Sequence, residues 1–339
     1  QCMTLALQLS ARARHTVNAN PVVGCVIARD GEIIAQDYHR VYGKSHAEVN
    51  ALAHIDGKAK GATLYVTLEP CSHHGKTPPC TDAVIASGAT KVVIATLDPN
   101  PLVSGRGAQL LEHAGIEVEI GLLENEAKAL NRGFIKRMKT GLPFVTSKIA
   151  MSLDGKTAMA NGESKWITSE AARVDVHKLR RDNQAILTGS GTVLKDNPSM
   201  TARLLGNSVT PLRVVIDSNN QLTDKNLNVF SDDAQTLVIN RDNCDSSMNG
   251  KVDLKAALLK LGEMGINTVL VEAGSGLHGA LQQAGLIDEL VIYTAPVLLG
   301  IDATSMMQLP IATMGDKVAL KIHDYRQIGT DMKITASFE

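Results

Sequence analysis

Apolar residues in the first 140 positions follow two alternating periods, which predict helices interleaved with strands. The spacing over Met3–Arg14 predicts an amphipathic helix. The runs Val22–Ala28 and Ile33–Asp37 flank Arg29-Asp30-Gly31, which is typical of a β-hairpin. Further strands are expected at 62–68, 91–95 and 116–120, and further helices at 45–54 (N-capped by Ser45), 81–87, 105–113 and 124–139. This order predicts a layered α/β domain with helices on a central sheet.

A second α/β pattern begins after Thr140-Gly141-Leu142-Pro143, which ends the preceding helix. Strands are expected at 144–150, 184–188, 213–216, 236–240, 268–272 and 289–294, with helices at 169–181 and 254–264. A chain of 339 residues is too long for one ordinary domain. We therefore expect two domains, 1–141 and 142–339.

Composition narrows the classes of function. The net charge of -1 leaves no basic footprint for a nucleic-acid backbone, and an aromatic content of 3% offers few rings for stacking bases. No apolar run reaches the roughly 18 residues of a membrane span, and the first residues lack a secretion pattern, so we expect a cytoplasmic protein without a membrane partner. The five widely spaced cysteines argue against a disulfide framework and for a reducing compartment.

The candidate chemistry of the first domain lies in His46-Ala47-Glu48, Pro70-Cys71 and Cys80. One imidazole and two thiolates can hold zinc and leave a fourth position for water, as catalytic zinc sites do. The carboxylate of Glu48 suits the proton transfers that such a water requires. An H-x-E and P-C signature with a third ligand downstream is typical of zinc deaminases acting on amino-substituted bases. We therefore expect His46, Cys71 and Cys80 as metal ligands and Glu48 as the catalytic residue.

Eight residues separate the two thiols, more than in the P-C-x-x-C signature of nucleic-acid and nucleoside deaminases. This insertion contains His73 and His74, either of which would complete a purely structural zinc site. That alternative stays open, as does a nucleic-acid or nucleoside deaminase with an accessory C-terminal domain.

The insertion Pro70–Cys80, with Asn20-Pro21-Val22-Val23-Gly24 before it and Asp98-Pro99-Asn100-Pro101 after it, resembles the bacterial bifunctional deaminase–reductase of riboflavin biosynthesis. That family deaminates 2,5-diamino-6-(5-phosphoribosylamino)pyrimidin-4(3H)-one and then reduces the ribosyl chain of 5-amino-6-(5-phosphoribosylamino)uracil to ribityl. The resemblance covers nearly the whole chain. It implies a cytidine-deaminase-like α/β/α domain, a dihydrofolate-reductase-like α/β domain, zinc and NADPH as cofactors, and a homodimer or homotetramer.

The resemblance also implies roles for three sets of residues. The deaminase substrate would contact Asn20, His39, His73 and Lys76. NADP would contact Ala150, Trp166, Thr192, Asp196, Ser218, Gly274, Ser275, Gly276, Leu277, His278, Gly279 and Ala280. The reductase substrate would contact Ser164, Arg180, Ser199, Arg203 and Glu272.

Several of these residues also have a simpler explanation. Trp166 would suit a hydrophobic core, and Arg180 and Arg203 would suit surface salt bridges. The run Gly274–Gly279 is a GxGxxG that follows a predicted strand and opens a helix, which suits a pyrophosphate. Its place near the end of the chain does not suit a Rossmann domain. The proton donor of the reduction stays open among Lys148, Asp196 and Glu272.

Overall fold

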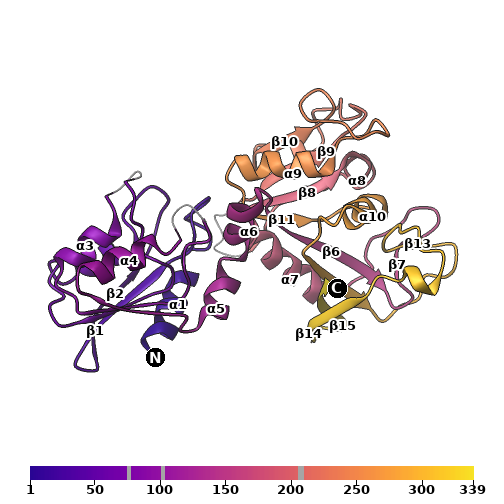
Figure 1. Ribbon diagram of the computed structural model, residues 1–339. Helices are drawn as coiled ribbons and strands as arrows, with labels where there is room; N and C mark the ends of the chain where they lie inside the picture. Colours follow the sequence, from indigo (N-terminus) through magenta and orange to yellow (C-terminus); the bar gives the residue numbers. More distant parts are fainter. Residues whose placement is uncertain (75–77, 101–103, 205–209) are drawn as a thin grey trace. The chain divides into compact units, whose positions relative to one another are not determined.

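The computed structural model describes residues 1–74, 78–100, 104–204 and 210–339 (Figure 1). The chain divides into two compact units, Gln1–Gly141 and Leu142–Glu339. All five cysteines are free thiols, which agrees with the expected absence of disulfides. Within the described ranges, no helix has both the length and the apolar character needed to cross a membrane.

The first unit is built on a five-stranded sheet with the order β2-β1-β3-β4-β5. Strands β1 (Gly24–Arg29) and β2 (Glu32–Tyr38) form the predicted hairpin, and β1 also pairs antiparallel with β3 (Thr63–Val66). Strands β4 (Lys91–Ile94) and β5 (Glu117–Ile120) extend the sheet in parallel.

Helices cover both faces of this sheet, because successive side chains of a strand point to opposite faces. Ile27 and Ile94 belong to the core against α2 (Ala47–Ala53), α3 (Cys80–Ala86) and α4 (Arg106–His113). The other face of the sheet packs against α1 (Cys2–Ala11) and α5 (Glu124–Leu130). This is the α/β/α layering that the resemblance implied.

Two helix boundaries differ from the prediction. Helix α2 begins at Ala47 with His46 as its N-cap, so the assignment of Ser45 as the cap was wrong. The helix expected over 124–139 is two helices, α5 and α6 (Arg132–Thr140), interrupted at Asn131. The Asn131 side chain accepts from the Val22 N–H at 2.8 Å and donates to the Val22 carbonyl at 2.9 Å, which is a backbone-like pairing.

The second unit contains an eight-stranded sheet with the order β10-β9-β8-β11-β6-β12-β15-β14. The six strands from β10 to β12 in that order are parallel, and β15 and β14 close the sheet antiparallel. The six parallel strands are the six expected ones: β6 (Phe144–Ser152), β8 (Ala185–Gly189), β9 (Leu212–Ile216), β10 (Thr236–Ile239), β11 (Thr268–Val271) and β12 (Glu289–Ala295). The C-terminal hairpin of β14 (Leu320–Ile328) and β15 (Asp331–Phe338) was not expected. A small sheet pairs β7 (Lys156–Ala158) with β13 (Thr304–Ser305).

Helices α9 (Leu254–Glu263) and α10 (Ser275–Gln283) pack on one face of the large sheet. Helices α7 (Glu170–Arg181) and α8 (Ser190–Asp196) lie on the other face. Because the parallel strands run the same way, their carboxyl ends share one edge, which is where ligands bind in open α/β sheets. The predicted mixed α/β class is thus observed in both units.

Candidate functional site

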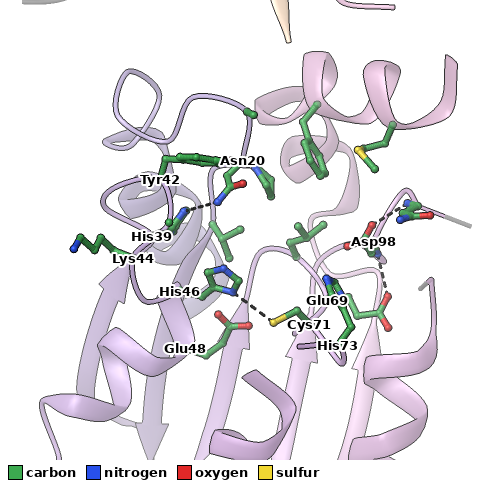
Figure 2. Close-up of a pocket in the computed structure, with 18 of the residues that line it drawn as sticks. Asn20, His39, Tyr42, Lys44, His46, Glu48, Glu69, Cys71, His73 and Asp98 are labelled. Atoms are coloured by element: carbon green, nitrogen blue, oxygen red, sulfur yellow. Dashed lines mark hydrogen bonds between the residues drawn. The ribbon is translucent and has the colours of Figure 1, made fainter. Parts of the chain in front are cut away.

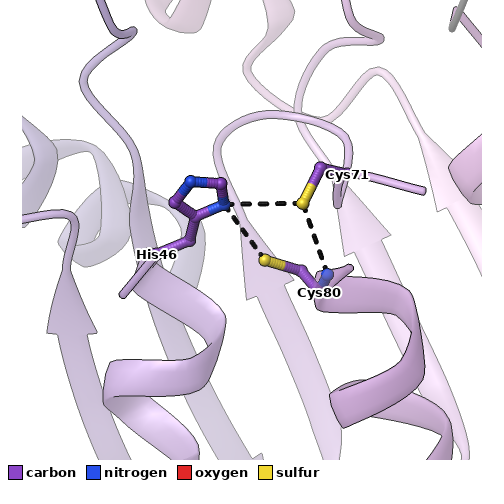
Figure 3. A group of neighbouring side chains, drawn as sticks. All are labelled: His46, Cys71 and Cys80. Atoms are coloured by element: carbon purple, nitrogen blue, oxygen red, sulfur yellow. Dashed lines mark hydrogen bonds between the residues drawn. The ribbon is translucent and has the colours of Figure 1, made fainter. Parts of the chain in front are cut away.

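Three side chains of the first unit converge on one point (Figure 3). His46 caps α2, Cys71 follows β3, and Cys80 opens α3. His46 Nδ1 lies 3.5 Å from Cys71 Sγ and 3.2 Å from Cys80 Sγ, and all three donor atoms are within 4.8 Å of one another. No other His, Cys, Asp or Glu of the described chain joins this group, so neither His73 nor His74 closes it into a four-ligand structural site.

The chemistry of these donors fits zinc, which prefers imidazole nitrogen and thiolate sulfur. Hydrogen bonds from Cys80 and His46 lower the pKa of the Cys71 thiol to about 4, against the opposing effect of burial. The Cys80 backbone N–H also donates to Cys71 Sγ at 3.3 Å. The lowered pKa favours the thiolate form of Cys71, which is the form that binds a metal ion.

Glu48 lies in the first turn of α2, two residues after His46. Its side chain is 3% exposed, and burial raises the pKa of its carboxyl to about 7. Glu48 is not part of the ligand group, so its carboxyl remains available for proton transfer.

A cavity of about 390 Å³ opens beside this group (Figure 2). That volume lies within the usual range of about 300–1,000 Å³ for small-molecule pockets. Asn20, His39 and His73, which the resemblance assigned to the deaminase substrate, line it together with His46 and Glu48. Lys76, predicted for the same set, lies outside the described residues.

Asn20 and His39 form one hydrogen-bonded unit in the cavity wall. Nε2 of His39 lies 3.0 Å from Nδ2 of Asn20, and Nδ1 lies 3.1 Å from the carbonyl oxygen of Ser45. A carbonyl only accepts, so Nδ1 carries the proton and Nε2 accepts from the Asn20 amide. Burial lowers the pKa of His39, which keeps the ring neutral. The amide oxygen is then the polar atom that Asn20 can offer to a ligand.

Sequence reasoning assigned no role to Glu69, Asp98 or Arg137, which also line the cavity. Glu69 directly precedes the Pro70-Cys71 pair of the zinc signature, so its position was a usable signal. Burial raises the pKa of the Asp98 carboxyl. Arg137 lies on helix α6 and donates to the Ala19 carbonyl at 2.8 Å. The two residues are 118 positions apart in the sequence, so no local pattern predicts this contact.

In the second unit, Glu272 follows β11 at the carboxyl edge of the sheet and is the centre of an ion-pair group. Its carboxylate accepts from Arg180 Nε at 2.6 Å and Nη2 at 3.0 Å, and lies 3.4 Å from Lys148 Nζ. Although burial opposes it, the charges of Arg180 and Lys148 lower the pKa of Glu272 to about 2. Arg180 also donates to the Thr201 carbonyl at 3.2 Å, so this residue is a partly buried member of a network and not a surface salt bridge.

The other residues predicted for the reductase substrate lie outside helices and strands. Arg203 is exposed, and its backbone N–H donates to His177 Nδ1 at 3.2 Å. Ser164 and Ser199 are half-buried. Trp166 is 70% exposed with the Arg173 guanidinium 4.7 Å from its ring centre, so it is not the core residue that its type alone suggested.

The glycine-rich run Gly274–Gly279 follows β11 and opens α10, as expected. At Gly274 and Gly276 a β-carbon would meet at closest a side-chain oxygen at 3.9 Å and 3.4 Å, so the backbone there is open to a cofactor. At Gly279 a β-carbon would lie 2.1 Å from the Gln308 carbonyl oxygen, so this glycine is required by packing.

His278, predicted to touch the cofactor, turns its side chain into the protein and is 2% exposed. Its Nδ1 lies 2.7 Å from Ser147 Oγ, and its Nε2 accepts from the Ala273 N–H at 3.3 Å. Both ring nitrogens are therefore used within the protein. Ser275 is also buried, whereas Ala280 is exposed and Leu277 is half-buried.

The remaining residues predicted to bind NADP lie on elements at or just beyond the carboxyl edge of the sheet. Ala150 is near the end of β6, Thr192 and Asp196 are on α8 directly after β8, and Ser218 follows β9. The Oγ of Ser218 accepts from the Val252 N–H at 3.0 Å. This convergence, with the open backbone at the start of α10, suits a dinucleotide.

Two family models match the chain. The cytidine and deoxycytidylate deaminase zinc-binding region matches residues 1–96, and the RibD C-terminal domain matches residues 143–334. The described metal group lies in the first match, and the Arg180–Glu272 group lies in the second. A zinc deaminase domain and a reductase domain are therefore joined in one chain, which supports the bifunctional prediction over a deaminase with an accessory domain.

Curated relatives and solved structures agree over the full length. The riboflavin biosynthesis protein RibD of Escherichia coli (strain K12) is 46% identical and covers 97% of this chain and 96% of its own. The structure of Acinetobacter baumannii RibD (form 2) has a TM-score of 0.91 at 40% identity over 99% of this chain and 98% of that one. The diaminohydroxyphosphoribosylaminopyrimidine deaminase/5-amino-6-(5-phosphoribosylamino)uracil reductase of Thermotoga maritima has a TM-score of 0.90 at 36% identity, covering 100% and 98%. This chain belongs to the RibD family of bifunctional zinc- and NADPH-dependent enzymes of riboflavin biosynthesis.

Proposed function

We propose that residues 1–141 deaminate 2,5-diamino-6-(5-phosphoribosylamino)pyrimidin-4(3H)-one and that residues 142–339 reduce the ribosyl chain of 5-amino-6-(5-phosphoribosylamino)uracil to ribityl. The observation that carries the first assignment is a three-ligand His46, Cys71 and Cys80 group beside a cavity that also contains the spare carboxyl of Glu48. The two reactions act on small molecules, and the net charge of -1 gives no reason to add a nucleic acid.

In the deaminase site, His46, Cys71 and Cys80 would hold the zinc ion, which when bound supplies a Lewis acid that makes water nucleophilic near neutral pH. Glu48 takes a proton from the attacking water and returns one to the departing amine nitrogen. The buried position of Glu48 suits this exchange, because neither its protonated nor its ionised form is strongly disfavoured when the pKa is about 7. Asn20 presents its amide oxygen to a donor on the pyrimidine edge.

In the reductase site, Ala150, Thr192 and the start of α10 would hold NADPH, which when bound supplies the hydride. Glu272 is ionised at neutral pH and therefore has no proton to give, but it holds Arg180 and Lys148 in place. Lys148, whose Nζ lies 3.4 Å from Glu272 at this edge of the sheet, remains a candidate proton donor together with Asp196. Exposed Arg203 suits a phosphate of the substrate, since guanidinium binds phosphate in a bidentate manner.

We further propose a cytoplasmic homo-oligomer that pairs through β14. This strand is at the end of the sheet order, and Ile322 and Tyr325 on it are 58% and 73% exposed. An exposed edge strand with apolar side chains is a template for association. Light scattering of Ile322→Lys tests this: a smaller species than wild type supports it, and an unchanged mass refutes it.

The catalytic assignments are tested by a coupled assay that follows ammonia release and NADPH consumption separately from the diaminopyrimidine substrate. We expect ammonia release first and one NADPH oxidised for each ammonia released. Ammonia without NADPH oxidation would remove the reductase assignment. Neither signal from folded, zinc-loaded enzyme would remove the substrate assignment for both domains.

A further inference from the structure

Glu69 lies between β3 and the zinc ligand Cys71, and its carboxylate accepts hydrogen bonds from four backbone N–H groups. It is 5% exposed and lines the cavity. Its Oε1 accepts from Gly107 at 2.8 Å and Ala108 at 3.2 Å, at the start of α4. Its Oε2 accepts from Gly105 at 2.9 Å and Asp98 at 3.0 Å. Figure 2 shows the contact between Glu69 and Asp98 in the cavity wall.

The hydrogen bonds of Glu69 have two kinds of partner: backbone groups at the start of α4 and the backbone of Asp98. A residue that only capped α4 would need the contacts with Gly105, Gly107 and Ala108, because these three residues are the N-cap and the first turn of the helix. The remaining Oε2 contact is with the backbone of the cavity residue Asp98, outside the helix. Asp98 in turn accepts from the Asn100 N–H at 2.8 Å, so the backbone held by Glu69 also fixes the direction of the Asp98 carboxyl.

The start of α4 is also locked sterically to the same place. A β-carbon at Gly107 would lie 2.2 Å from the Pro70 carbonyl oxygen and 3.1 Å from Glu69 Cγ. Pro70 directly precedes Cys71, so the contact joins the start of α4 to the segment containing a metal ligand.

We propose that Glu69 is a positioning residue of the deaminase site, which sets Asp98 against the pyrimidine substrate by holding the Asp98 backbone and the start of α4. This inference rests on the proposed deaminase function. It assigns to Glu69 no contact with substrate and no proton transfer; the residue acts through Asp98.

The test is Glu69→Gln in the full-length enzyme, assayed for ammonia release, zinc content and NADPH oxidation with the deaminated intermediate. Glutamine keeps the shape but places an NH₂ group against two of the four N–H donors, which loses two buried hydrogen bonds. We expect KM for the diaminopyrimidine to rise about tenfold or more, with kcat, zinc content and reduction near wild type. Glu112→Gln, at an exposed site on α4, is the matched control.

Gly107→Ala disturbs the same contact without removing the carboxylate, so it should raise the same KM. In an Asp98→Asn background, Glu69→Gln should add little, because the residue it positions is already altered. Three results would each overturn the inference. The first is a wild-type KM in both Glu69→Gln and Gly107→Ala, and the second is a loss of zinc that accompanies the loss of activity. The third is a fully additive effect of Glu69→Gln and Asp98→Asn. Absence of ammonia release by the wild-type enzyme would instead overturn the proposed function.

Discussion

Asn20 donates its amide N–H to Nε2 of His39 over 3.0 Å, and this bond fixes which polar atom of Asn20 is left for a ligand. Replacing Asn20 with alanine removes that atom and also leaves the buried His39 nitrogen without its donor. We expect Asn20→Ala to lower kcat/KM for ammonia release by about 10- to 100-fold, as one unsatisfied buried group plus one lost contact imply. Reduction of the deaminated intermediate by the same variant is the internal control, and a loss there too would contradict a local role.

Glu48→Gln should separate metal binding from catalysis. The amide cannot carry protons, so we expect ammonia release to fall by about 10²- to 10⁴-fold, the usual range for general acid–base catalysis. Zinc content measured by atomic absorption should stay at the wild-type value, because Glu48 is not in the ligand group. Deamination at the wild-type rate would show that the proton carrier is another group.

Metal removal should affect only one of the two activities. Chelation with a strong zinc chelator should abolish ammonia release, and added zinc should restore it. NADPH oxidation with the deaminated intermediate should continue, because the described metal group draws all its ligands from the first unit. Parallel loss of both activities would mean that the second unit also depends on the metal.

Replacement of Arg203 and replacement of Arg180 should have different effects on the unfolding free energy of the protein. Arg203→Ala should raise KM for the reductase substrate and leave the unfolding free energy near wild type, since Arg203 is exposed. Arg180→Ala should also destabilise the protein, by about 3–5 kcal/mol, because it leaves the largely buried Glu272 carboxylate, 13% exposed, with only Lys148 as a partner. Urea unfolding with Arg241→Ala as the exposed control distinguishes them, and equal stability of both variants would refute the network.

His278 should make the second unit less stable as pH falls. Burial lowers its pKa from 6.5 to about 4, with the charge of Lys148 acting in the same direction and that of Glu272 against it. The folded state therefore favours the neutral ring. Its contribution of about 3 kcal/mol is complete above pH 6.5 and is lost progressively between pH 6.5 and about 4.

Urea unfolding at pH 7, 6 and 5 checks this prediction. His278→Gln should be less stable than wild type at pH 7, because it disturbs the contacts with Ser147 and Ala273. It should also show a shallower decline toward pH 5, since an amide does not titrate. An identical pH slope in the two proteins would assign the acid sensitivity to other groups.

Local patterns predicted the strands of both units well because each strand has its own alternation or apolar run. They failed where a distant residue decides the structure. Asn131 interrupts the expected helix because it pairs with Val22, 109 residues earlier. The sequence pattern did not predict the hairpin of β14 and β15, because β14 is exposed along most of its length and shows no inward-facing apolar stripe.

The metal ligands were predictable as a set because their residue types and order are distinctive. The contacts that orient the rest of the site were not. The direction of the hydrogen bond from Asn20 to His39 depends on the Ser45 carbonyl, which accepts from His39 Nδ1. That carbonyl is available because α2 begins one residue later than predicted. The four hydrogen bonds of Glu69 depend on residues that lie 29 to 39 positions further along the chain.

The close approach of Gln308 to Gly279 bears on attempts to change cofactor preference by design. A library that varied all three glycines of the motif would include Gly279, where the β-carbon of even an alanine would lie 2.1 Å from a carbonyl oxygen. Side chains that favour a different dinucleotide have steric room only at the first two glycines. Redesign of this enzyme should therefore keep Gly279, because the atoms that exclude a side chain there belong to the Gln308 backbone and no substitution at Gln308 removes them.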